Sequence, residues 1–331
     1  MTAVDCGASQ SVNAILATLP AGPNTVEVSG VCPEDVRVDG FDDLWLIGLP
    51  GAGLRSLTIE KSRRIQARGF AITPTGPTGV TVRRSSCDLA LLSVDGGATA
   101  NGFVVDLSSD VMLNSVSATN VRNGLSVSRH STVIANGALT LTGLFPTSPG
   151  DSTSGINLAG ASLLQASLDG PSAVRGFSTG LSSRDNSTAA MFVAGGLATP
   201  VLSIDSNRND GILATSGAVT LVGPSAVNGH ASGAGISMAD GAVLQLSQGV
   251  RLQGNGAGLS LRNNATARIV FGTDLSGNNV GVSTRTSSVV HFAGLSITFA
   301  ANGTDVTCDA TSVASGVGLT NAATVTCANQ S

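Results

Sequence analysis

The sequence has few charged residues, few aromatic residues and no tyrosine. Of its 331 residues, 11% are charged and 3% are aromatic, and tryptophan occurs once. Coiled coils and long helices carry far more charge than this, and disordered chains carry less than the 42% of apolar residues found here. With its 42 Gly residues, the composition indicates a folded protein built from short strands and tight turns.

Positive charge and long apolar runs are also scarce. The formal net charge is −4, and Lys61 is the only lysine. A nucleic-acid-binding domain carries a basic patch, so we expect no nucleic-acid partner. No apolar run approaches the roughly 18 residues of a membrane span, so we expect none. The first residues show no signal-peptide pattern, and we interpret them as the start of a mature protein preceded by an initiator Met.

Four of the five cysteines lie near the two ends of the sequence. Cys6 and Cys32 bracket the N-terminal segment, and Cys308 and Cys327 bracket the C-terminal one. We predict two disulfides, which indicate an oxidising compartment: the protein is secreted, on the cell surface, or in the periplasm. The alternative is four reduced core cysteines. We interpret Cys87 as a buried single thiol.

One regular feature is present, a repeat with a period near 23 residues. Each copy begins with apolar and polar residues in alternation, as in residues 258–262. The first apolar residues of the copies are Val36, Leu57, Val80, Phe103, Leu125, Ile156, Leu181, Ile212, Ile236, Leu259, Val282 and Val306. The intervals between them are 21 to 25 residues, apart from two of 31. A sustained period of this length is typical of a solenoid.

Each period divides into three short strand-like pieces joined by short turns. These turns are too short for the helical crossovers of βαβ units. We therefore predict an all-β solenoid of about 11–12 coils, with three strands in each coil. A β-propeller or a β-sandwich is the alternative, but it would have longer strands and aromatic or charged repeat signatures.

The predicted organisation is a single domain over residues 1–331. Residues 1–32 form an N-terminal cap with a helix over 9–19, residues 33–303 form the coils, and residues 304–331 form a C-terminal cap. Caps are expected because an uncovered end would expose apolar core and unpaired strand edges. The two long intervals predict surface loops, one around 143–153 and the other near 194–200 or 207–210.

The cap helix, the three-strand coils and the Asn-rich turns at 255–258 and 278–281 resemble the right-handed parallel β-helix of the pectin-lyase-like superfamily. The resemblance covers nearly the whole chain and implies the fold. Members of that superfamily include polysaccharide lyases, glycoside hydrolases, epimerases, phage tailspikes and adhesins. The Asn-Thr-Asp, Gly-His-Gly and Arg-Ile-Lys motifs of polygalacturonase-like hydrolases are missing from this sequence, so the resemblance leaves the activity open.

The register of the repeat places one set of polar residues in an outward strip. Its members are Glu60, Arg83, Arg84, Asp106, Ser128 and Arg129. Stacked coils bring such residues within about 5 Å of each other per step. Because Arg can hold uronate carboxylates, we assign catalysis in a lyase to Arg83 and Arg129, and substrate binding to the other four. The alternative is a ladder of ion pairs on a solvated sheet.

A second polar group lies near the later long interval. Its members are Arg184, Asp185, Asp205 and Asp210. Glycoside hydrolysis uses two carboxylates about 5–9.5 Å apart, so these residues are candidates for a hydrolase site. The alternative is that they occupy turns, where Asp makes local hydrogen bonds.

Taken together, these patterns predict a secreted or cell-surface protein with a structural and carbohydrate-binding role. Its partner would be a polysaccharide or a cell-surface glycan. A polysaccharide-active enzyme is the alternative, either a uronate lyase using Arg or a hydrolase using paired Asp. We expect no cofactor and no metal site, because paired Cys motifs and clustered Asp motifs are missing; calcium is the cation kept open.

Overall fold

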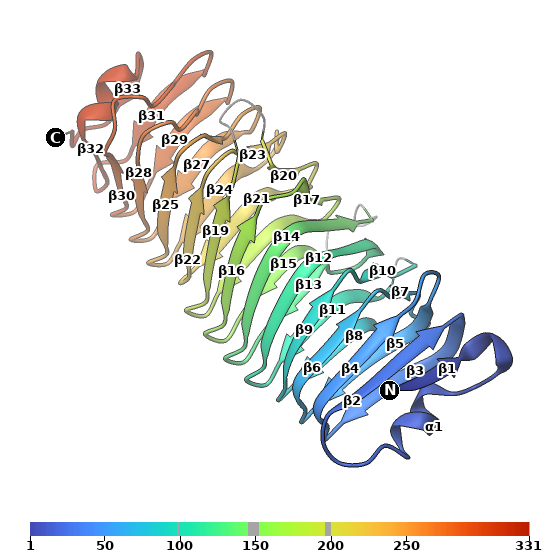
Figure 1. Ribbon diagram of the computed structural model, residues 1–331. Helices are drawn as coiled ribbons and strands as arrows, with labels where there is room; N and C mark the ends of the chain where they lie inside the picture. Colours follow the sequence, from blue (N-terminus) through green and yellow to red (C-terminus); the bar gives the residue numbers. More distant parts are fainter. Residues whose placement is uncertain (98, 145–151, 196–199, 331) are drawn as a thin grey trace.

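The computed structural model describes residues 1–97, 99–144, 152–195 and 200–330, and in it the chain winds into an elongated rod (Figure 1). Strands from successive turns lie side by side along the rod, and the two termini lie at its opposite ends (Figure 1). Hydrogen bonds link 33 strands of the described residues, and their pairings are parallel. The prediction of an all-β parallel solenoid is confirmed.

Each turn contributes strands to three sides of the rod, which we call sheets 1, 2 and 3. Sheet 1 contains β3 (Val31–Asp39), β5 (Gly53–Glu60), β8 (Thr78–Arg83), β11 (Asn101–Asp106), β13 (Leu125–Val127), β15 (Ser154–Leu158), β18 (Thr179–Arg184), β21 (Asp210–Thr215), β24 (Ala234–Ala239), β27 (Ala257–Leu261), β29 (Val280–Thr284), β31 (Thr304–Cys308) and β33 (Val325–Thr326).

Sheet 2 contains β1 (Thr2–Asp5), β2 (Asn24–Ser29), β4 (Asp42–Gly48), β6 (Arg63–Arg68), β9 (Ser86–Ala90), the first halves of β12 (Asp110–Val121) and β14 (Thr132–Gly143), β16 (Leu163–Leu168), β19 (Thr188–Val193), β22 (Ala218–Val222), β25 (Val243–Ser247), β28 (Thr266–Ile269), β30 (Val289–Phe292) and β32 (Val313–Ser315). Sheet 3 contains β7 (Ala71–Ile72), β10 (Ser93–Asp95), the second halves of β12 and β14, β17 (Ser172–Arg175), β20 (Leu202–Asp205), β23 (Ser225–Asn228) and β26 (Val250–Arg251).

Sheet 1 carries the repeat that is visible in the sequence. The first apolar residue of each copy pairs with that of the next, from Val36 with Leu57 through to Val306, which pairs further with Val325. Alternate residues of a strand point to opposite faces, and one face here lines the interior of the coil. The repeated apolar residues are therefore buried, as Val36 and Leu57 show, and they form the core.

The rod has about 14 turns, somewhat more than the 11–12 expected from the repeat. The difference comes from the two ends. Strands β1 and β2 precede the first counted copy; β1 pairs with β2, and β2 pairs with β4. Strand β33 follows the last copy and pairs with β31. Both terminal segments therefore extend the sheets as well as closing the ends.

The N-terminal helix is shorter than the predicted 9–19. Helix α1 spans Val12–Leu16 and follows a short 3-10 helix, η1 (Cys6–Ala8). Ser9 has a left-handed backbone with φ of 64°, so the helix cannot start there. The side chain of Ser11 caps the helix by accepting a hydrogen bond from the N–H of Ala14 (3.1 Å).

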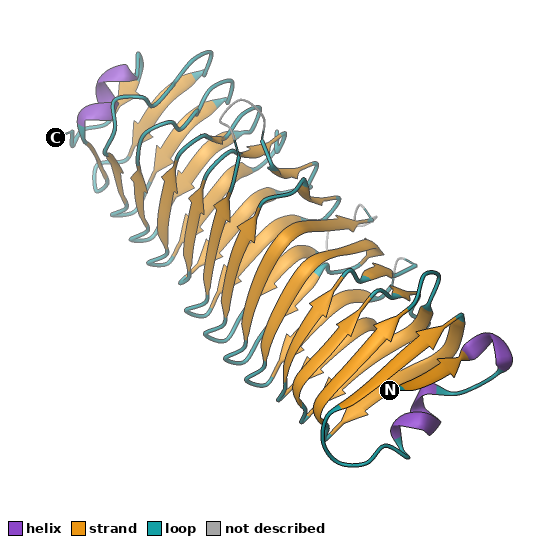
Figure 2. Cartoon of the chain, in the orientation of Figure 1, coloured by secondary structure: helices purple, strands orange, loops and turns teal. Residues whose placement is uncertain are grey.

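Both predicted disulfides are present. Cys6 is bonded to Cys32, and Cys308 is bonded to Cys327. Each bridge lies within one terminal segment of the chain. The C-terminal segment also contains a second 3-10 helix, η2 (Val317–Asn321). Helical segments lie at the two ends of the rod in Figure 2, and none among the described residues is long and apolar enough to cross a membrane.

Two rows of buried polar side chains run inside the corners of the coil. Between sheets 1 and 2, the hydroxyl of Ser85 accepts from the N–H of Ser62 (3.0 Å), and the hydroxyl of Ser109 accepts from that of Ser85 (3.3 Å). Between sheets 3 and 1, the side-chain oxygen of Asn278 accepts from the N–H of Asn255 (3.0 Å). Each side chain satisfies a buried turn N–H of the preceding coil, which explains the Ser-rich and Asn-rich turns.

The two long intervals do not interrupt the stacking of sheet 1. Strand β13 pairs with β15, and β18 pairs with β21, in the register that the repeat predicts. The extra residues therefore lie between strands. The expected loops fall largely on residues 145–151 and 196–199, which lie outside the described residues. Residues 207–210 form a corner, in which Asn207 is buried and accepts from the N–H of Phe177 (3.1 Å).

Candidate functional site

Three residues of the predicted strip, Glu60, Arg83 and Asp106, lie side by side at the ends of neighbouring strands of sheet 1. Asp39 pairs with Glu60, Glu60 with Arg83, and Arg83 with Asp106. The guanidinium of Arg37 lies 2.8 Å from the carboxylate of Asp39 and 2.9 Å from that of Glu60. The guanidinium of Arg37 therefore pairs with both carboxylates, those of Asp39 and Glu60, as expected for ion pairs between neighbouring strands.

Asp106 is the buried member of this strip, with a side chain that is 3% exposed. Its carboxylate accepts hydrogen bonds from the hydroxyl of Ser128 (2.8 Å) and from Nε of Arg129 (2.6 Å), and it forms an ion pair with the same guanidinium. Burial alone would raise the pKa of Asp106, but these donors outweigh burial and hold the pKa below its usual value. Asp106, Ser128 and Arg129 thus form one cross-strand cluster.

The turns after sheet 1 bring Arg84 and His130 to the same corner as Arg129. Arg84, Arg129 and His130 line a hollow of about 620 Å³, together with Leu107 and Ser108. Arg84 and Arg129 occupy left-handed turn positions, with φ of 49° and 53°. Glu60, Arg83 and Asp106 therefore lie on neighbouring strands, and Arg129 is engaged with the buried carboxylate of Asp106.

The second predicted group is spread over two sheets. Arg184 ends β18 and Asp185 follows it, whereas Asp210 begins the neighbouring strand β21. Since Arg184 pairs with Thr215, Asp185 and Asp210 lie near opposite ends of the strands, about 20 Å apart at 3.3 Å per residue. The structure does not bring these two carboxylates together.

Asp205 and Asp210 each have local partners. Asp205 ends β20 in sheet 3, and its carboxylate accepts a hydrogen bond from the hydroxyl of Ser203. Asp210 accepts from the N–H of Ala234 (2.8 Å), and burial raises the pKa of its carboxyl group. These are local hydrogen bonds of the kind that Asp makes at strand ends and turns, which is the alternative to a hydrolase site.

Clustered His, Cys, Asp and Glu side chains are the usual metal ligands in proteins. The one such group among the described residues consists of Cys6, Cys32 and Glu34. Its two sulfurs are joined in a disulfide, so they cannot act as thiolate ligands. Glu34 instead accepts hydrogen bonds from the hydroxyl of Ser11 (2.8 Å) and the side chain of Asn13 (2.9 Å), which ties α1 to the first coil.

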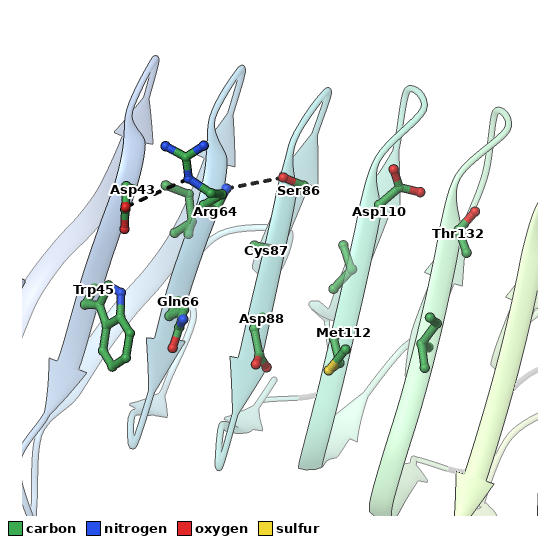
Figure 3. Close-up of a pocket in the computed structure, with 13 residues that line it drawn as sticks. Asp43, Trp45, Arg64, Gln66, Ser86, Cys87, Asp88, Asp110, Met112 and Thr132 are labelled. Carbon is green, nitrogen blue, oxygen red and sulfur yellow. Dashed lines mark hydrogen bonds and ion pairs between the residues drawn. The ribbon is translucent and has the colours of Figure 1, made fainter. Parts of the chain in front are cut away.

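The outer face of sheet 2 carries a groove of about 700 Å³ that crosses β4, β6, β9, β12 and β14. Its outward side chains form two rows, as Figure 3 shows for the labelled residues. The upper row is Asp43, Arg64, Ser86, Asp110 and Thr132. The lower row is Trp45, Gln66, Asp88, Met112 and Ile134. We call this surface the Trp45 groove.

The lower row combines flat apolar surface with hydrogen-bonding groups. Trp45, Met112 and Ile134 are 38%, 39% and 37% exposed, and together they give the row a partly apolar surface. Gln66 and Asp88 lie between Trp45 and Met112. A Trp ring presents a flat surface that the apolar face of a sugar ring can cover, and amide and carboxylate groups bind hydroxyls. The row is suited to a polyhydroxylated ligand.

The charges of the groove do not favour an anion. Asp43, Asp88 and Asp110 line it, and Arg64 is the only basic residue among the lining residues. The guanidinium of Arg64 lies 3.0 Å from the carboxylate of Asp42, so its charge is already balanced. The groove therefore has a negative excess.

Cys87 lies under the groove between the two rows. It is 8% exposed, and burial raises the pKa of its thiol, with a smaller contribution from the charge of Asp88. The thiol therefore stays protonated at neutral pH and is a poor nucleophile. This agrees with the prediction of a buried single thiol.

The groove was missed in the sequence because only the outward residues of the first strand in each coil were considered. Residues 44–47 are all apolar, so the alternation of Leu44, Trp45 and Leu46 between buried and exposed appears only in the structure. Extending the register to the second strand would have aligned Trp45 with Gln66 and Asp88.

Comparisons with known proteins give no family assignment. No protein-family model matches the chain, and no curated protein matches it. Among solved structures, the chain is similar to the A-module of the mannuronan C-5 epimerase AlgE6 from Azotobacter vinelandii, with 11% identity over 96% of this chain and 92% of that chain and a TM-score of 0.39.

Two further solved structures show comparable similarity. PfbA, a surface adhesin of Streptococcus pneumoniae, is 12% identical over 94% of this chain and 92% of that chain, with a TM-score of 0.33. An alginate lyase from Paenibacillus sp. str. FPU-7 is 11% identical over 99% and 97%, with a TM-score of 0.26. Similarities this low carry no argument about function.

Proposed function

We propose that this protein is an extracellular β-helix that binds a carbohydrate through the Trp45 groove. The observation that carries the proposal is the exposed Trp45, set on a rigid sheet beside Gln66 and Asp88. Aromatic side chains are scarce in this chain, and placing its only Trp on an outer face sacrifices burial that would otherwise stabilise the core. Binding sites positioned on a rigid scaffold in this way need little reorganisation to engage a ligand.

The two disulfides support the extracellular part of the proposal. Structural disulfides persist in oxidising environments, such as the cell exterior, the cell surface and the periplasm. Both bridges are at the ends of the rod, where a solenoid without them would fray most readily. The proposal therefore places the protein outside the cytoplasm, either free or at a cell surface.

Binding without catalysis is favoured by the state of Arg129 and by the positions of Asp185 and Asp210. A lyase base must be free to take a proton from its substrate, whereas Arg129 pairs with the buried Asp106. A glycoside hydrolase needs two carboxylates that flank the glycosidic bond it cleaves, whereas Asp185 and Asp210 lie near opposite ends of neighbouring strands.

The proposal is tested by measuring binding to a panel of soluble glucans, xylan, mannan and polygalacturonate by calorimetry and affinity electrophoresis. We expect Trp45→Ala to lower the affinity for the bound polymer by at least about tenfold, which is about 1.4 kcal/mol. The matched control is Phe271→Ala, which removes another exposed aromatic ring, 50% exposed and outside the groove residues. Its affinity should equal that of the wild type.

Two results would contradict the proposal. One is the absence of binding to every polymer of the panel by a folded wild-type protein. The other is an unchanged affinity of Trp45→Ala, which would move the site elsewhere. In the same samples, unsaturated products and new reducing ends should stay at background; product formation would instead support the lyase or hydrolase alternative.

A further inference from the structure

A second hollow lies further along the same face of the rod. It has a volume of about 580 Å³, and its lining includes Asn136, Asp169, Phe192 and Gln248. Phe192 is 43% exposed on β19, so it presents a second aromatic surface on sheet 2. We call this hollow the Phe192 pocket.

The two aromatic residues are separated along the rod by a defined distance. From β4, which carries Trp45, the strands of sheet 2 follow in the order β6, β9, β12, β14, β16 and β19. Six strand spacings of about 4.8 Å place the two rings about 29 Å apart. The strand pairings align Phe192 with Ile47 of β4, which lies two residues beyond Trp45. This sideways offset is small compared with about 29 Å, so the line from Trp45 to Phe192 runs nearly along the rod axis.

Polar side chains join the two hollows. Asn114 donates a hydrogen bond to Asp88 in the Trp45 groove (2.6 Å). The side chain of Asn136, which lines the Phe192 pocket, donates to that of Asn114 (3.5 Å). In the next coils Asn136 pairs with Ser167, and Ser167 with Phe192. Amide and hydroxyl groups both donate and accept hydrogen bonds, as sugar hydroxyls do.

The strands between and beyond these hollows present no charged side chain outward, and Asp169, which follows β16 and lines the Phe192 pocket, adds an acidic group there. The outward residues of the five consecutive strands β14, β16, β19, β22 and β25 are Thr132, Ile134, Asn136, Leu163, Gln165, Ser167, Thr188, Ala190, Phe192, Ala218, Thr220, Val222, Val243, Gln245 and Ser247. All fifteen are uncharged. A polyanion would gain nothing from this surface and would be repelled by the acidic excess of the Trp45 groove.

We infer that the Trp45 groove and the Phe192 pocket are two parts of one binding surface for an extended, unbranched and uncharged polysaccharide lying along the rod. The inference rests on the proposed carbohydrate-binding function and adds the ligand class and its direction. A short oligosaccharide occupies the Trp45 groove alone. A chain of several sugar units reaches Phe192 and gains a second stacking contact within the same complex, so its affinity is higher.

The test compares short and long ligands on two variants. Disaccharides and decasaccharides of the cellulose, xylan, mannan and laminarin series are titrated into the full-length wild type, Trp45→Ala, Phe192→Ala and the control Phe271→Ala. For the series that binds, we expect the wild type to bind the decasaccharide at least about tenfold more tightly than the disaccharide. Phe192→Ala should lose that difference and keep the disaccharide affinity, and Trp45→Ala should weaken both.

The failures of the two proposals are distinguishable. If Trp45→Ala weakens binding but Phe192→Ala leaves the decasaccharide affinity unchanged, the groove binds carbohydrate and the extended surface is wrong. If polygalacturonate binds more tightly than every neutral series, the uncharged ligand is wrong. If Phe192→Ala changes the sedimentation of the free protein and no glycan affinity, the face is an interface between copies of this chain, and the inference is overturned.

Discussion

The outer faces of sheets 1 and 2 are built from the same coils but use their side chains differently. On sheet 1, Arg37, Glu60 and Asp106 satisfy one another or Arg129 through ion pairs and hydrogen bonds. On sheet 2, Trp45, Met112 and Ile134 remain exposed, and Gln66 lies among them. The first face pairs the carboxylates of Glu60 and Asp106 with guanidinium groups, whereas the second keeps apolar surface that a ligand can cover. Charged residues on a regular sheet are therefore a weaker indication of a site than exposed apolar ones.

The sharpest test of this comparison makes the same substitution on both faces. Asp106→Asn should lower the free energy of unfolding by about 2–3 kcal/mol, because a buried carboxylate with charged and hydroxyl donors is lost. Its glycan affinity should be unchanged. Chemical denaturation and calorimetric titration measure the two quantities. A loss of binding with normal stability would show that sheet 1 contributes to the site.

The matching substitution on the other face is Asp88→Asn. Asp88 is partly exposed and has Asn114 as its hydrogen-bond partner, so the free energy of unfolding should change by less than about 0.5 kcal/mol. Affinity for the bound glycan should fall about threefold to tenfold, since a charged acceptor is replaced by a neutral group. The opposite pattern, lower stability with full affinity, would contradict the division between the faces.

The acid dependence of stability should also separate the two faces. The pKa of Asp106 is held below its ordinary value in the folded protein. The carboxylate therefore stabilises the fold at a pH above its unfolded pKa of about 3.9, and this contribution is lost as the pH falls through the lower folded pKa. Denaturation at a series of pH values should show a smaller acid loss in Asp106→Asn than in the wild type. Equal slopes would mean that Asp106 is not a stabilising carboxylate.

The smallest effect is expected from the double change Arg83→Ala and Arg84→Ala. Both side chains are exposed, and an exposed charge contributes little to stability. Binding to a neutral glycan should equal that of the wild type within a factor of about two. If the double variant instead loses binding to polygalacturonate or a lyase activity, the strip on sheet 1 is the functional surface after all.

The sequence was informative about the fold because the core of sheet 1 repeats with a nearly constant period. Leu57 and Leu259 belong to copies far apart in the chain and occupy the same column. The interior of a solenoid must be filled in every turn, so each turn repeats the pattern. The number of turns was less predictable, since the end strands β1, β2 and β33 lack the full pattern.

The candidate sites were less predictable, for two physical reasons. The adjacency of Glu60, Arg83 and Asp106 follows from register, but the pairing of Asp106 with Arg129 depends on the conformation of a long side chain in a turn. Nearness in sequence is also misleading in a solenoid. Asp205 and Asp210 are five residues apart, yet they lie on different sheets.

The serine and asparagine rows give the rod a direction. In both rows the side chain of a later coil accepts the N–H of an earlier one, as Ser85 does for Ser62 and Asn278 does for Asn255. A coil therefore remains incomplete until its successor is in place, and synthesis from the N-terminus supplies the missing acceptors in order. If one whole repeat were removed from the middle of the rod, the Ser and Asn acceptors of the following coil would meet the equivalent N–H groups of the preceding coil. Cutting within a repeat would leave the buried N–H groups at that junction without partners, so growth and shortening of such rods should proceed in whole coils.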